Sequence, residues 1–376
     1  MKRERVVLLN KKAVIILAGA VIGVTALILV RMGNPPNMGF CIACFLRDLT
    51  GGLGLQRSDT LQYIRPEIPG LVLGAFLASL FTREYRPLGG SSPLIRFVLA
   101  FFTMTGMLVF LGCPLRMLLR MAGGDLNALV GLFGLVAGVV LGIAFLRKGF
   151  SLGRATVLNR SNLYIFPAAA AALMVLLLAR PAYFFFSQQG PASLHAPVYV
   201  SLAAGVLAGI LAQRSRLCFV GGIRDFIIFR DLYLLYGFAA IFLTVLAGNL
   251  ILGNFKIGFT GQPIAHSDGL WNFLGMALAG YGSVFLGGCP LRQLVSAAEG
   301  NTDSAVTVLG LAAGAAFAHN FGIAASAKGV PAEGKAAVLV GFAVIFLIAL
   351  LNCKLALKKG VQAGGRTEGC AGSSVS

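Results

Sequence analysis

Two copies of one cysteine-containing pentapeptide are the residues of this chain best suited to chemistry. Residues 112–116 read Gly-Cys-Pro-Leu-Arg, and residues 288–292 read the same, 176 positions later. A second pair of cysteines, Cys41 and Cys218, has almost the same separation, and an Arg-Asp pair follows each of them at a similar distance. The sequence therefore predicts a duplicated chain with cysteines at equivalent places in its two halves.

The proline of each pentapeptide defines the local backbone. Proline disfavours helical geometry in the residue before it and is favoured as the first residue of a helix. Cys113 and Cys289 are therefore expected to cap two short helices. The unpaired N–H groups and the positive dipole end of such a helix attract anions, and a thiol adds a polarisable donor. The residues predicted to form these caps, beside the cysteines, are Gly112, Pro114, Gly288 and Pro290.

Further candidates extend this interpretation to four short helices. Cys41 and Cys44 precede one of them and Cys218 another, while the arginine of each pentapeptide either attracts an anion or reaches towards lipid headgroups. The Arg-Asp pairs at 47–48 and 224–225 are interpreted as ion pairs that brace these helices. The predicted substrate path consists of Cys41, Cys113, Cys289, Cys218, Cys44, Arg116 and Arg292.

Other kinds of site find no support in the sequence. The three histidines are scattered without metal-ligand spacing, and no nucleotide-binding or hydrolase motif occurs. The Cys-x-x-Cys spacing of Cys41 and Cys44 is typical of redox sites, but Gly221 stands at the second position in the other half. Cys353 and Cys370 are interpreted as inert. We therefore expect neither an enzyme nor a metal or cofactor.

Composition predicts an all-α polytopic membrane protein. The chain is 57% hydrophobic and 12% charged, with a mean hydropathy of +0.86, whereas soluble domains carry about 25% charged residues. Ten apolar runs approach the ~20 residues that cross a bilayer. The net charge of +18 does not indicate nucleic-acid binding, because the basic residues collect between the apolar runs, where they contact anionic lipid.

The distribution of basic residues predicts the orientation. Cytoplasmic loops of membrane proteins carry an excess of Lys and Arg. Ten crossings with both termini in the cytoplasm agree with this rule in most of the loops, and residues 31–67 are the exception. Five crossings in each half would give two inverted repeats, with re-entrant half-helices, at residues 1–180 and 181–357, followed by a disordered cytoplasmic tail at 358–376. Because inverted repeats meet at the midplane, Cys113 and Cys289 are expected to lie close together there.

Three stretches resemble the YeeE/YedE membrane family. They are the duplicated pentapeptide, Phe-Cys-Ile-Ala-Cys-Phe at 40–45 and Ala-Gly-Gly-Asp-Leu-Asn at 122–127, and the resemblance is closest to the YedE branch linked with selenium metabolism. It covers the chain to about Leu357. It implies transport of a small sulfur- or selenium-containing anion, thiosulfate- or selenite-like, across a bacterial inner membrane. It also implies that Cys41, Cys113 and Cys289 pass the ion along by S–H hydrogen bonds.

Two alternative functions stay open at this point. One is a membrane thiol oxidoreductase that uses Cys41 and Cys44. The other is a membrane partner that transports nothing and hands sulfur or selenium to a small soluble carrier protein.

Overall fold

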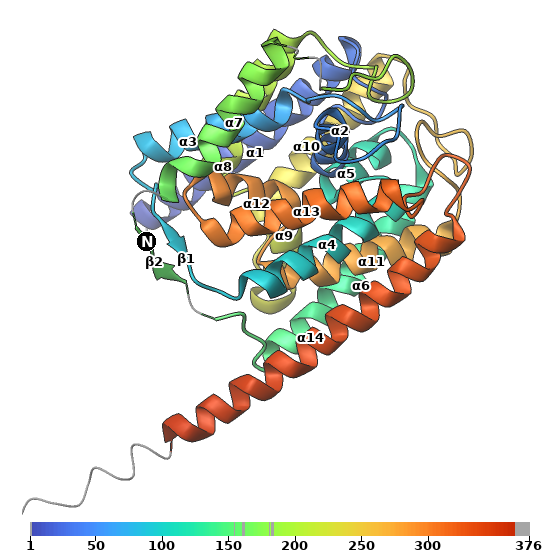
Figure 1. Cartoon of the computed structure of the whole chain (residues 1–376). Coiled ribbons are helices and arrows are strands. Elements are labelled where there is room, and N and C mark those ends of the chain that lie inside the picture. The colour runs from blue at the N-terminus through green and yellow to red at the C-terminus, as the bar shows by residue number, and fades with distance from the viewer. Residues whose placement is uncertain (1, 154, 160–161, 180, 182–183, 365–376) are drawn as a thin grey trace, which may run out of the picture.

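The computed structural model describes residues 2–153, 155–159, 162–179, 181 and 184–364 (Figure 1). Side chains are described between residues 12 and 353, except at 154, 160–163, 180 and 182–183. Helices dominate this part of the chain, and a two-residue antiparallel pair, β1 (Leu88–Gly89) with β2 (Thr156–Val157), is the one sheet in it.

Each of the ten predicted apolar runs forms one long helix. These helices are α1 (Lys2–Arg31), α3 (Glu67–Phe81), α4 (Pro93–Phe110), α6 (Leu126–Arg147), α7 (Asn162–Ala179), α8 (Val198–Ser215), α10 (Tyr233–Ile251), α11 (Gly269–Leu286), α13 (Thr302–Asn320) and α14 (Ala332–Gly364). Within the described residues, seven segments are long and apolar enough to cross a membrane, and two further apolar helices are shorter. The all-α polytopic membrane fold is thus confirmed. Ten crossings stay a prediction, because α3 has only 15 residues and α13 begins and ends with polar residues.

Four short helices interrupt the long ones, as the cysteine motifs predict. They are α2 (Ile42–Gly52), α5 (Pro114–Ala122), α9 (Phe219–Phe229) and α12 (Pro290–Ala298). With these included, α1 to α7 and α8 to α14 follow the same order of long and short elements. Each short helix spans at most 11 residues, too few to cross a bilayer.

The two halves interlock by exchanging partners. Helix α1 packs on α10, and their counterparts α8 and α3 pack on each other. In the same way α6 packs on α11, and the counterparts α13 and α4 form the matching pair. The last long helix of each half departs from this plan: α7 packs on α3, whereas α14 runs along α4, α11 and α6 (Figure 1).

The counterparts α4 and α11 cross in opposite directions. Gly106 lies against Gly275, while Thr103, earlier in α4, lies against Gly282, later in α11. The glycines allow this approach because a Cβ at Gly275 would come within 2.8 Å of the Gly106 carbonyl oxygen. Antiparallel counterparts are what inverted repeats require. The inverted repeat itself and the boundaries at 180 and 357 stay predictions.

The C-terminal tail is described only in part. Helix α14 continues to Gly364, and the remaining residues, Cys370 among them, lie outside the described residues.

Candidate functional site

The first thiol cluster consists of Cys41, Cys44 and Cys113 at the N-termini of α2 and α5. Cys41 caps α2, and its Sγ accepts a hydrogen bond from the backbone N–H of Cys44 at 3.2 Å. The Sγ atoms of Cys41 and Cys44 lie 2.6 Å apart, and the Cys113 thiol interacts with that of Cys41. All three cysteines are free and buried. Three reduced thiols therefore share one enclosed place between two half-helices.

The second thiol pair consists of Cys218 and Cys289 at the N-termini of α9 and α12. The Sγ of Cys218 accepts hydrogen bonds from the backbone N–H groups of Gly221, at 3.2 Å, and Cys289, at 3.4 Å. Both cysteines are free and buried. Gly221 takes the place of Cys44, so this site holds two thiols instead of three.

The backbone at the caps is duplicated together with the sequence. Cys41 (φ −143°, ψ 101°) and Cys218 (φ −152°, ψ 113°) share one extended conformation. Cys113 (φ −83°, ψ 170°) and Cys289 (φ −69°, ψ 167°) share another, and a helix starts at the proline after each of them. The predicted caps are confirmed, and the cysteines occupy equivalent positions in the two halves.

The glycine of each pentapeptide makes room for its arginine. A Cβ added at Gly112 would lie 3.0 Å from Cδ of Arg116, and one at Gly288 would lie 3.0 Å from Cγ of Arg292. At Gly288 the added atom would also lie 3.4 Å from the Cys218 sulfur. Each arginine therefore folds back over the cap of its own half-helix, beside the thiols, instead of extending to the lipid surface.

Arg116 is completely buried and faces no carboxylate within ion-pair distance among the described side chains. Its guanidinium donates hydrogen bonds to three backbone carbonyl groups, those of Asn37 at 3.3 Å, Ile264 at 3.1 Å and Leu111. It also donates to the Sγ of Cys44 at 3.5 Å. The first thiol cluster therefore contains an uncompensated positive charge, which attracts an anion.

Arg292, the counterpart of Arg116, is neutralised. Its Nη2 pairs with Oε2 of Glu299 at 3.0 Å, and the other carboxylate oxygen of Glu299 pairs with Arg216 at 3.2 Å. Sequence reasoning overlooked Glu299 as a partner of Arg292, although its position seven residues later, at the C-terminus of α12, was a usable signal. Two arginines from identical pentapeptides thus have different electrostatic surroundings.

Both Arg-Asp pairs form ion pairs, as predicted. Asp48 pairs with Arg47 at 2.7 Å and with Arg65 at 2.8 Å, all three being buried. Arg224 and Asp225 form a more exposed pair at 2.9 Å. Sequence reasoning missed Arg65, which ties the loop before α3 to Asp48. A charged residue next to an apolar run was the available signal, because such residues require partners.

A similar buried ion pair lies between α5 and α6 in the first half. Arg120, near the C-terminus of α5, pairs with Asp125 at 2.7 Å, and Asp125 caps α6 by accepting from the Asn127 backbone N–H at 2.9 Å. The sequence indicated these two residues only as limits of the short helix. The pair ties the last turn of α5 to the N-cap residue of α6.

The expectation that Cys113 and Cys289 lie side by side is wrong. Each contacts the cysteine of the other half-helix in its own half. Because α4 and α11 are antiparallel, the ends that lead to the two Cys-Pro steps point in opposite directions. Phe110 packs near Gly275, and Leu286, the end of α11, lies roughly 16 Å further along at 1.5 Å per residue. The thiol sites thus lie in series along the helix axes, α2 and α5 towards one end and α9 and α12 towards the other (Figure 1).

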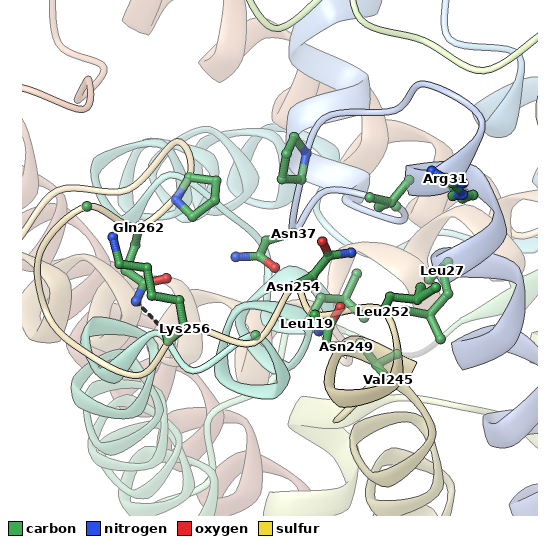
Figure 2. A pocket seen from close by; sticks show the side chains of 18 residues that line it. Leu27, Arg31, Asn37, Leu119, Val245, Asn249, Leu252, Asn254, Lys256 and Gln262 are labelled. Atoms are coloured by element: carbon green, nitrogen blue, oxygen red, sulfur yellow. Dashed lines mark hydrogen bonds between the residues drawn. The ribbon is translucent and has the colours of Figure 1, made fainter. Parts of the chain in front are cut away.

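A polar cavity of about 650 Å³ lies next to the first thiol cluster (Figure 2). Its lining includes Asn37, whose carbonyl group accepts a hydrogen bond from Arg116. Figure 2 shows Asn37 and Asn254 between Lys256 on one side and Arg31 on the other. These two basic residues belong to the lining, and no acidic residue does. The cavity therefore has a positive electrostatic character.

The remaining candidates lie away from this arrangement. Cys353 is in α14, where its thiol faces the carbonyl oxygen of Phe145 at 3.7 Å. Among the described residues, no group of three or more His, Cys, Asp or Glu side chains could hold a metal ion. His266 donates from Nε2 to the carbonyl oxygen of Val109 at 2.8 Å and accepts from the Asp268 backbone N–H, a structural role at the start of α11.

Comparison with known proteins gives a family match for most of the second half of the chain. Residues 214–360, which contain Cys218, Cys289 and Arg292, match a family described as sulphur transport. Over 105 residues the chain is 30% identical to the thiosulfate transporter TsuA of Spirochaeta thermophila. The match covers 28% of this chain and 31% of the relative, so the chain spans about a third of the relative's length. The branch linked with selenium metabolism stays a prediction. The match over residues 214–360 agrees with the resemblance of the sequence to the YeeE/YedE family.

Proposed function

We propose that this protein transports a small sulfur-containing anion, thiosulfate-like in size and charge, across the membrane. The observation that carries the proposal is the buried, uncompensated guanidinium of Arg116 beside three free thiols. The family match and the thiosulfate transporter among its relatives support the same substrate class. Selenite is a second substrate of the same kind, expected from the sequence resemblance.

Several groups in each site can replace the water that such an anion loses. Burying an ion costs several kcal/mol even after the protein relaxes. Backbone N–H groups at the half-helix N-termini, the helix dipole and the buried arginine offset this cost. Neutral thiols donate S–H hydrogen bonds to the terminal sulfur of the anion, whereas a thiolate would repel it. The thiols therefore act as neutral donors in the proposed path.

The proposed path connects the positive cavity to both thiol sites. Arg31 and Lys256 concentrate anions in the cavity, and Arg116 draws one into the first thiol cluster. Contacts between half-helices of opposite halves, α5 with α9 and α2 with α12, join the first cluster to the second thiol pair. With both termini in the cytoplasm of a bacterium, the cavity faces outwards and the second pair faces the cytoplasm, which corresponds to uptake through the inner membrane.

A second candidate function is thiol oxidation at Cys41 and Cys44, whose sulfur atoms lie 2.6 Å apart. Forming a disulfide there would release two electrons and two protons and would need an electron acceptor. The second half has Gly221 in place of the second thiol of this spacing, so the Cys-x-x-Cys arrangement is not duplicated. We therefore favour transport. Delivery to a soluble carrier protein stays a prediction from the sequence.

Uptake of ³⁵S-thiosulfate into proteoliposomes tests the proposal, with labelled selenite and sulfate compared under the same conditions. Cys113→Ala removes the S–H donor and is expected to reduce uptake roughly 10- to 100-fold, because a hydrogen bond to a charged group contributes about 1.5–3 kcal/mol. Cys113→Ser keeps a donor and should retain more activity. Cys353→Ala is the control and should transport normally.

Two outcomes would contradict the proposal. Wild-type protein that accumulates none of the three anions would exclude transport of this class. Equal loss in Cys113→Ser and Cys113→Ala, together with a disulfide or persulfide trapped during turnover, would favour covalent thiol chemistry instead.

A further inference from the structure

The arginines of the two pentapeptides differ in that only one of them has a carboxylate partner, and this difference has a functional consequence. Arg116 is fully buried and lacks a carboxylate partner among the described side chains, whereas Arg292 pairs with Glu299 at 3.0 Å. Both arginines follow a Cys-Pro step and fold back over the cap of their half-helix. The two caps share one backbone geometry, although only the first site has a third thiol, and the carboxylate is the difference that acts directly on the arginine.

The residue at the C-terminus of each half-helix explains the difference. Glu299 is the C-cap of α12, and Gly123 is the C-cap of α5, at the corresponding position. A Cβ at Gly123 would lie 2.6 Å from Oδ1 of Asn37, so a glutamate there would displace the Asn37 side chain, which lines the cavity. With glycine at this position, the first half lacks the carboxylate that the second half contains.

Glu299 is held in a chain of ion pairs that reaches the surface. Arg216 pairs with Glu299 at 3.2 Å and with Glu84 at 2.7 Å. The side chains of Arg216 and Glu84 are 47% and 43% exposed, whereas those of Arg292 and Glu299 are 17% and 10% exposed. Because Glu299 has a second cation, it keeps a partner when Arg292 turns to another anion.

We propose that Glu299 competes with the transported anion for Arg292 and so makes the second thiol pair a weak site from which the anion is released. The first thiol cluster, with its uncompensated arginine, is the site of capture. An anion that reaches the second thiol pair replaces the Glu299 carboxylate at Arg292, and the carboxylate moves towards Arg216. When the carboxylate returns to Arg292, it displaces the anion. This inference rests on the proposed transport of a sulfur anion and adds a difference in affinity between the two sites.

Glu299→Gln tests the competition, because it removes the charge and retains the shape. Purified protein is alkylated with N-ethylmaleimide over a range of thiosulfate concentrations, and the modification of Cys113 and Cys289 is followed separately by peptide mass spectrometry. Thiosulfate should protect Cys289 at about fivefold lower concentration in the variant, the factor that corresponds to about 1 kcal/mol. Protection of Cys113 in the same sample should be unchanged.

Two further variants separate competition from loss of the ion-pair chain. Glu84→Gln is the matched control, since it removes a carboxylate from Arg216 but none from Arg292. Because the Glu84–Arg216 pair is exposed and screened by solvent, protection of Cys289 should shift far less than in Glu299→Gln. Arg216→Gln removes the second cation of Glu299, so that Glu299 pairs with Arg292 only. The carboxylate then competes more strongly, and protection of Cys289 should require more thiosulfate. This opposite shift keeps the proposal testable if Glu299→Gln fails to fold.

The outcomes are distinguishable. Equal protection of Cys289 in the wild type and Glu299→Gln, or an equal shift in Glu84→Gln, would overturn the competition while leaving transport intact. If thiosulfate protects neither cysteine in the wild type and is not taken up, the proposed function fails, and the competition fails with it. In proteoliposomes Glu299→Gln should slow release and lower the maximal uptake rate about fivefold.

Discussion

Replacing Arg116 by glutamine tests the central electrostatic claim about the first thiol cluster. The guanidinium lies 3.5 Å from the Cys44 sulfur, so an anion held by these thiols would lie about 4 Å from the positive charge. At that separation, and at the effective dielectric constant of about 20 that describes protein sites, the attraction is about 4 kcal/mol per unit of anion charge. Loss of water around the substituted amide offsets part of this energy, and we expect at least a hundredfold loss of thiosulfate affinity.

The same change should have little effect on folding. A buried charge without a carboxylate partner is costly to keep, and glutamine can still donate to one of the carbonyl groups that the guanidinium now binds. Thermal unfolding followed by circular dichroism should therefore shift by only a few degrees. A collapse of stability would mean that Arg116 is mainly a structural residue of the cap.

Arg292→Gln is the matched control for this experiment, because Glu299 already neutralises that arginine. Its affinity for thiosulfate should change less than about fivefold, the factor that corresponds to about 1 kcal/mol. Concentration dependence of ³⁵S-thiosulfate uptake in proteoliposomes, at equal protein content, gives both values. Equal effects of the two substitutions, or normal uptake by Arg116→Gln, would refute the reasoning.

Other expected outcomes concern packing, topology and pH. Gly112→Ala adds a Cβ 3.0 Å from the arginine side chain and should reduce uptake severalfold by displacing it, measured in the same liposome assay. In an otherwise cysteine-free chain, Glu84→Cys should react with a membrane-impermeant maleimide only from the cytoplasmic side and Ser267→Cys only from outside; reversed labelling would contradict the orientation. Burial lowers the pKa of His266, so the unfolded chain binds its proton first and stability falls as the pH drops below about 6.5. His266→Asn should flatten that fall in melting temperature between pH 7 and pH 5; an unchanged slope would assign the pH dependence to other groups.

Local chemistry explains why the caps could be predicted from the sequence. A proline after each pentapeptide cysteine disfavours helical geometry at the cysteine and favours a helix from the proline on, and both effects are local. Cys113 and Cys289 therefore adopt nearly the same backbone conformation in two distant parts of the chain. The ten long helices follow in the same way from apolar runs, because a backbone in lipid must satisfy its own hydrogen bonds.

The pairing of the thiols could not be predicted in this way. Duplication indicated that equivalent cysteines exist, but which of them meet depends on the direction in which α4 and α11 cross. Their glycine contacts show that they are antiparallel, and Cys113 lies with Cys41 while Cys289 lies with Cys218. The ion pair of Arg292 could not be predicted either, because it depends on the conformation of Glu299 at the C-terminus of α12.

The sequence by itself determined the membrane class, the duplication and the residues with unpaired N–H groups, because each depends on hydropathy or on one or two neighbouring residues. Only the tertiary structure decided that Arg116 is buried without a counter-ion and that Arg292 has one. The physical reason is that a charge is compensated by the groups near it in space, which need not be its neighbours in the sequence. Gly123 and Glu299 stand at equivalent positions, seven residues after the arginine, and only Glu299 has a carboxylate that can pair with it. The two identical pentapeptides therefore produce two sites of different charge.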